Sequence, residues 1–79
     1  MNRRTEMDHA LGGMVRDAVT AREASRWLAD DGSRGVTLCL DSVGFWCIRV
    51  WSPALIDERR TSQTTAADDF LDTLETILP

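Results

Sequence analysis

The clearest hydrophobic pattern lies at the end of the chain. Over residues 66–78, apolar side chains recur every three or four positions, which is the spacing of one face of an α-helix. These side chains are Ala67, Phe70, Leu71, Leu74, Ile77 and Leu78. Thr65 has the spacing of a helix start with Asp68. The pattern predicts an amphipathic helix over about 66–78, and its acidic side chains fall off the apolar face.

A second pattern, in the middle of the chain, predicts a β-hairpin with strands at about 36–40 and 45–51. These segments are rich in β-branched and aromatic residues, and turn-forming residues separate them. If Gly44 is the left-handed residue that follows a type I turn, Asp41 faces Phe45 across the hairpin. That register gives one fully apolar face, which consists of Val36, Leu38, Leu40, Trp46, Ile48 and Val50.

The first third of the chain predicts a helix over residues 14–30, which ends before Gly32. Its apolar side chains again recur every three or four positions. They are Met14, Val15, Ala18, Ala21, Ala24 and Leu28. A second interpretation remains open, in which residues 14–19 form a strand. The helix would then start at Thr20, which has the capping-box spacing with Glu23.

Three further expectations concern the remaining segments. Residues 1–13 are polar and contain two consecutive glycines, so we expect them to be frayed. Pro53 should end the second strand and begin a helical turn that includes Leu55, and residues 57–64 should be a polar loop. The chain as a whole, residues 1–79, is thus expected to be one α+β domain with an N-terminal helix, an antiparallel β-hairpin and a C-terminal helix.

Composition and charge limit the classes of protein to which this chain can belong. The chain has 79 residues, a net charge of −4 and 43% apolar residues, as expected for one small globular domain. Residues 61–79 contain four acidic residues and no Arg, so their field is anionic and disfavours direct nucleic-acid binding. Apolar runs such as 43–48 are too short to cross a bilayer, and no apolar leader follows Arg4. We therefore expect a cytoplasmic protein that does not bind membranes.

The candidate chemistry is sparse. His9 lies in the segment expected to be frayed, and the chain has no glycine-rich phosphate motif. Cys39 and Cys47 should face each other across the hairpin, as free thiols in a reducing cytosol or as a disulfide in oxidising buffer. Neither cysteine has the spacing of a zinc site. We expect no enzymatic activity, no metal and no cofactor.

Two different roles are predicted for the three tryptophans. Trp27 and Trp46 are expected in the core. Trp51 falls on the mixed face of the hairpin beside Arg49 and Phe45, and aromatic and Arg side chains are favoured at interface hot spots. That face is the candidate surface for a protein adaptor or a homo-oligomeric interaction module.

In size, acidity and order of elements, the chain resembles the small phage-encoded anti-CRISPR proteins, most nearly one that acts on a type I-C system. The resemblance implies a monomeric, non-enzymatic inhibitor in the host cytoplasm, which binds the RNA-guided surveillance complex (Cascade) and blocks target DNA. Clustered carboxylates would then occupy the basic channel that normally holds DNA. The candidate carboxylates are Asp68, Asp69, Asp72 and Glu75, followed by Asp57 and Glu58.

Overall fold

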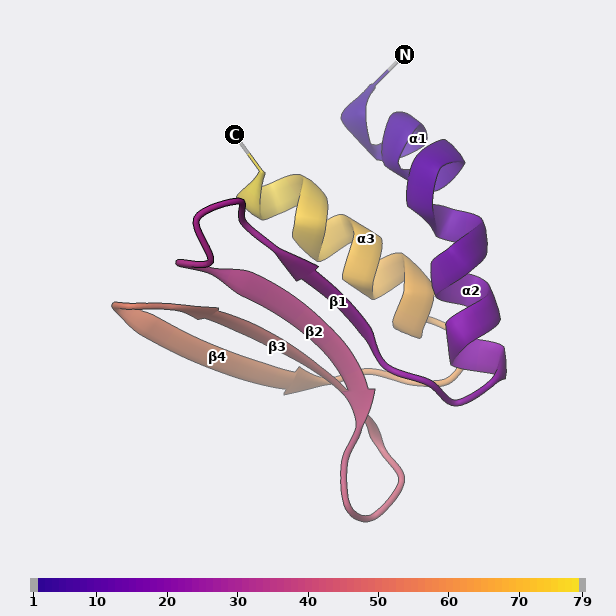
Figure 1. Cartoon of the computed structure of the whole chain (residues 1–79). Coiled ribbons are helices and arrows are strands. Elements are labelled where there is room, and N and C mark those ends of the chain that lie inside the picture. The colour runs from indigo at the N-terminus through magenta and orange to yellow at the C-terminus, as the bar shows by residue number, and fades with distance from the viewer. Residues whose placement is uncertain (1, 79) are drawn as a thin grey trace.

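The computed structural model describes residues 2–78, which form two layers (Figure 1). A four-stranded antiparallel sheet makes one layer, and the helices cover one of its faces. In chain order the elements are α1 (Arg3–Met7), the π-helical turn η1 (Asp8–Gly12), α2 (Gly13–Thr20), β1 (Ser25–Leu28), β2 (Gly35–Leu40), β3 (Trp46–Ser52), β4 (Leu55–Arg60) and α3 (Ala66–Ile77). The α+β class is confirmed, and the sheet has two strands more than the predicted hairpin.

The central hairpin, β2 with β3, has the predicted register. The backbone N–H of Asp41 donates to the carbonyl of Phe45 at 2.8 Å, and Gly44 has the expected left-handed conformation, with φ of 91°. Cys39 lies directly opposite Cys47. The sequence predicts this hairpin well because only one register places every large apolar side chain on the same face.

The core lies between that apolar face and the helices. Val36, Leu38 and Ile48 point from the sheet and are almost completely buried, and Trp46 is buried beside them. From α3, the predicted stripe packs against them. Its most deeply buried members are Phe70, Leu71 and Leu74. The C-terminal helix is therefore confirmed, although the Thr65 side chain makes no capping hydrogen bond to it.

The N-terminal helix was predicted too late in the chain. Helical structure runs from Arg3 to Thr20, so residues 14–19 are helix, and residues 3–12 of the segment expected to be frayed lie in α1 and η1. The side chain of Asn2 caps this helix by accepting a hydrogen bond from the backbone N–H of Thr5 at 2.8 Å. The helix ends near Arg22, which takes a left-handed conformation with φ of 59° without being glycine.

The segment expected to finish that helix is instead the first strand. Ser25–Leu28 pairs antiparallel with β2, and Trp27, opposite Val36, is half-buried at the edge of the core. The helix predicted up to residue 30 and the alternative helix from Thr20 are therefore both wrong. Ser25–Leu28 is only four residues long, and its apolar positions fit the spacing of a helix as well as that of a strand. Periodicity alone therefore did not distinguish the two structures.

The region after Pro53 was also predicted wrongly. Pro53 and Ala54 form a tight turn, and Leu55–Arg60 is the edge strand β4 rather than a helical turn and a loop. Every residue of this strand is exposed, so it lacks the alternation of apolar and polar residues that reveals a half-buried strand. Its four consecutive charged residues are typical of a protected sheet edge.

Candidate functional site

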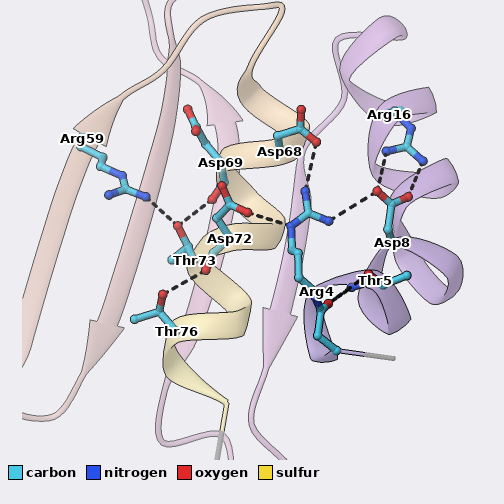
Figure 2. A network of polar contacts seen from close by, with 11 residues as sticks. Arg4, Thr5, Asp8, Arg16, Arg59, Asp68, Asp69, Asp72, Thr73 and Thr76 are labelled. Atoms are coloured by element: carbon cyan, nitrogen blue, oxygen red, sulfur yellow. Dashed lines mark hydrogen bonds and ion pairs between the residues drawn. The ribbon is translucent and has the colours of Figure 1, made fainter.

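Two of the predicted carboxylates, Asp68 and Asp72, lie on the side of α3 that faces α1 (Figure 2). Arg4 binds both of them: its Nε donates to Asp72 at 2.7 Å and its Nη2 donates to Asp68 at 3.1 Å. The third nitrogen, Nη1, donates to Asp8 at 3.4 Å. The hydrogen bond to Asp72 is the main cause of the raised pKa of Arg4. One guanidinium therefore fixes and partly neutralises three carboxylates.

A second ion pair extends this cluster along the helix layer. Arg16 Nη2 donates to Asp8 at 2.7 Å, and this hydrogen bond lowers the pKa of Asp8. The pair passes directly over Gly12, where a Cβ atom would lie 2.8 Å from Arg16 Nη2. A side chain at position 12 would therefore displace this exposed ion pair, which offsets the usual destabilisation by a glycine in a helix interior.

The other two carboxylates of α3 do not join this cluster. Asp69 accepts a hydrogen bond from the Thr61 hydroxyl, on the side of the helix nearer to β4. Arg59 Nη2 donates to the Thr73 hydroxyl on the same side at 2.7 Å. Glu75 is half-buried near the end of the helix. The four predicted carboxylates are therefore divided between two sides of α3 rather than forming one continuous acidic row.

The second pair of candidates, Asp57 and Glu58, is divided by the sheet itself. Asp57 lies opposite Val50 on the face toward the helices, where it lines a groove of about 220 Å³. Glu58 lies opposite Arg49 on the other face and pairs with its Nε at 2.9 Å. These neighbours in sequence therefore belong to different surfaces.

The three hairpin candidates, Phe45, Arg49 and Trp51, do share one surface, the outer face of the sheet, which the helices leave uncovered (Figure 1). Phe45 is exposed at the turn end, where the guanidinium of Arg60 lies 4.5 Å from the centre of its ring. Trp51 lies over Gly35, because a Cβ atom there would be only 2.7 Å from the indole ring. The predicted aromatic face therefore exists as a surface.

Sequence reasoning missed two apolar members of the outer face. Leu28, which is 47% exposed, lies opposite Gly35, and Ile56, which is 64% exposed, lies opposite Trp51. Because Gly35 itself pairs with Trp51, these four residues form one line across all four strands. We call Leu28, Gly35, Trp51 and Ile56 the apolar row. It could not be found from the sequence while β1 and β4 were not recognised as strands.

His9 and the two cysteines are the remaining groups of the described chain with candidate chemistry. His9 is exposed on η1, and a shallow opening beside it is lined by Arg4, Thr5 and Asp8. Cys39 and Cys47 are free thiols, and burial raises the pKa of Cys47, which disfavours its reactive thiolate. Over residues 2–78, no group of three or more His, Cys, Asp or Glu side chains is placed to hold a metal ion.

Within the same described range, no helix has the length and apolar character needed to cross a membrane. Comparison of the chain with protein-family models, curated proteins and solved structures found no match.

Proposed function

We propose that the protein is a non-enzymatic inhibitor that binds an RNA-guided CRISPR surveillance complex of type I, most nearly type I-C, and blocks its binding of target DNA. The observation that carries the proposal is the fixed pair of carboxylates on α3. Asp68 and Asp72 are held by one guanidinium, yet their side chains remain 63% and 62% exposed. Such a complex holds DNA through a basic channel, in which fixed carboxylates can replace phosphates.

The ion pairs also limit how strongly this surface imitates DNA. Arg4 and Arg16 together offset two of the three negative charges of Asp8, Asp68 and Asp72. The surface therefore presents ordered carboxylates of low net charge rather than a strongly anionic ridge. Its attraction for a basic channel should be short-ranged, and salt should weaken it at moderate concentrations.

A second candidate function is favoured by the apolar row. A protein adaptor, or an interaction module built from several copies of the chain, would use the outer face of the sheet. Binding there would rest on burial of Trp51, Leu28 and Ile56 and would depend little on salt. The two functions therefore differ in both the surface used and the response to ionic strength.

The test is a titration of the protein against a purified type I-C surveillance complex, at about 50 mM and about 300 mM salt. Co-migration and capture of target DNA would both be measured. We expect the protein to co-migrate with the complex and DNA capture to be lost. A complex that captures DNA normally at saturating protein would refute the inhibitor proposal.

A double variant separates the two surfaces. Asp68→Asn with Asp72→Asn removes two charges at little change in shape, and binding should weaken about tenfold. The matched control, Asp17→Asn with Glu23→Gln, removes the same charge at exposed positions elsewhere and should bind normally. Circular dichroism would verify that both variants fold. Normal binding by the α3 variant, with loss on Ile56→Ser, would assign the contact to the outer face instead.

A further inference from the structure

The apolar row is an unusual surface for a chain of this size. Leu28 and Ile56 are about half exposed or more, and the Trp51 ring lies between them in close contact with Gly35. No described element covers this side of the sheet, since α1, α2 and α3 all pack on the opposite face (Figure 1). Contiguous apolar surface of this kind is typical of an interaction site.

The borders of the row carry opposite charges. Arg26 lies opposite Thr37, and Thr37 lies opposite Arg49, which pairs with Glu58, so two guanidiniums and one carboxylate border the row on the side toward the middle of the sheet. On the other side, the turn between β1 and β2 contains two exposed carboxylates, Asp30 and Asp31, and one half-buried guanidinium, Arg34. The first border is therefore net positive and the second net negative, and in sequence Leu28 is two residues after Arg26 and two residues before Asp30.

This arrangement is complementary to itself. A two-fold axis that runs along the row places the row of one copy on the row of the other and reverses the strand direction. The basic border of each copy then faces the acidic border of the other. We propose that two copies of this chain associate face to face through the outer face of the sheet, with the apolar row at the centre and Arg26 of each copy facing Asp30 of the other.

Nucleic acid is a less suitable occupant of the same face. Arg49 is already paired with Glu58 at 2.9 Å, and Arg60 lies 4.0 Å from Asp41. Phosphates would have to compete with both carboxylates, and with a net charge of −4 on the chain. A second copy would give Arg26, which makes no ion pair within residues 2–78, a contact with the exposed Asp30.

The area of the outer face indicates the affinity that we expect for the dimer. Four strands spaced about 4.8 Å apart, with four to seven residues each, give a face of roughly 350 Å² in projection. A standard stable interface buries about 800 Å² on each partner. We therefore expect a weak dimer with a dissociation constant in the range of roughly 1 to 100 µM.

The first experiment is analytical ultracentrifugation of the protein alone, from about 1 µM to about 1 mM. The mass should rise from one chain to two across this range. Ile56→Ser, at an exposed site that folding does not need, should weaken association about tenfold, and Trp51→Ser should weaken it further. Met14→Ser is the matched control: Met14 is 66% exposed on the helix layer, so its loss should leave association unchanged.

A charge exchange tests the orientation of the two copies. Arg26→Asp and Asp30→Arg should each weaken the dimer several-fold, because like charges would then face each other. The double variant Arg26→Asp with Asp30→Arg restores two opposite-charge contacts and should recover the original affinity within about twofold. A merely structural role of either residue would not produce this recovery.

Three results would overturn the proposal. They are a single-chain mass at every concentration, a dimer that Ile56→Ser does not weaken, and a monomer whose tryptophan fluorescence responds to a single-stranded oligothymidine. The last result would assign the face to nucleic acid. The experiment contains no surveillance complex, so its failure would leave the proposed inhibitor function to be judged by its own test.

Discussion

Arg4 donates a hydrogen bond from Nε to Asp72 at 2.7 Å, across 68 positions of sequence, and so joins the first helix of the chain to the last. The same guanidinium binds Asp68 and Asp8 (Figure 2). A forked, planar group suits this position, because three carboxylates approach it from two helices.

Replacing Arg4 should therefore loosen the contact between α1 and α3. Arg4→Gln is expected to lower the free energy of unfolding by about 1 kcal/mol, a value kept small because solvent screens the exposed carboxylates. Arg4→Lys keeps the charge but loses the fork, so it should recover only part of the loss. Urea denaturation of the three proteins measures both effects, and equal stability of wild type and Arg4→Gln would contradict the prediction.

Gly35 and Gly13 should respond in opposite ways to alanine. A Cβ atom at Gly35 would lie 2.7 Å from the Trp51 ring and 2.8 Å from the backbone oxygen of Trp27, whereas at Gly13 it would meet no atom within 4 Å. Gly35→Ala should destabilise the fold by about 1–3 kcal/mol. Gly13→Ala should stabilise it by about 0.5–1 kcal/mol, because alanine favours the helix. Thermal melting of both variants tests the contrast, and a neutral Gly35→Ala would refute the placement of Trp51.

Asp41 should make stability depend on pH. Its carboxylate accepts the backbone N–H of Phe45 at 2.9 Å, and this hydrogen bond is the main cause of its lowered pKa. A lowered pKa in the folded state stabilises the protein above the ordinary carboxyl pKa of about 4, and the contribution is lost as the pH falls from there through the folded-state pKa. Asp41→Asn cannot titrate. Its stability should fall less steeply than that of the wild type below about pH 4 in denaturant titrations; parallel curves would argue against this role.

Gln63 connects the sheet to α2 through its amide group. Its oxygen accepts from Trp46 Nε1 at 2.5 Å, and its nitrogen donates to the carbonyl of Val19 at 3.2 Å. Gln63→Ala leaves the buried indole N–H without this acceptor and should cost about 1–2 kcal/mol. Gln63→Glu keeps the acceptor for Trp46 but loses the donor, so it should lie between the two in a thermal melt. Hydrogen exchange of the Trp46 indole should be faster in Gln63→Ala only.

Comparison of the sequence with the structure shows which patterns carry information. The central hairpin and α3 were predictable because their apolar side chains are long, numerous and confined to one face. The N-terminal helix was misplaced because its end at Arg22 has a left-handed conformation that is usually assigned to glycine. Two consecutive glycines are typical of a break in a helix, whereas here Gly12 makes room for the pair of Asp8 and Arg16.

The residues of the candidate site could be predicted from the sequence better than their arrangement in space. Phe45, Arg49 and Trp51 share a face because they belong to the one hairpin whose register could be derived. The acidic residues were treated as one surface, yet Asp68 and Asp72 turn toward Arg4 while Asp69 turns toward Thr61. Pairing between side chains that are far apart in sequence leaves no local pattern, so only the folded chain shows it.

The packing of α1 against α3 also sets the order in which these elements can pack during synthesis. Arg3 donates to the carbonyl of Leu78 at 2.6 Å, so residues far apart in the order of synthesis are in contact. After its own synthesis the N-terminal helix must wait, with the apolar side chains of Met7 and Val15 uncovered, until α3 has also been made. The sheet can form earlier, because each of its strands pairs with the next one synthesised. The helix layer therefore stays open to chaperones and proteases until α3 has been made and can pack.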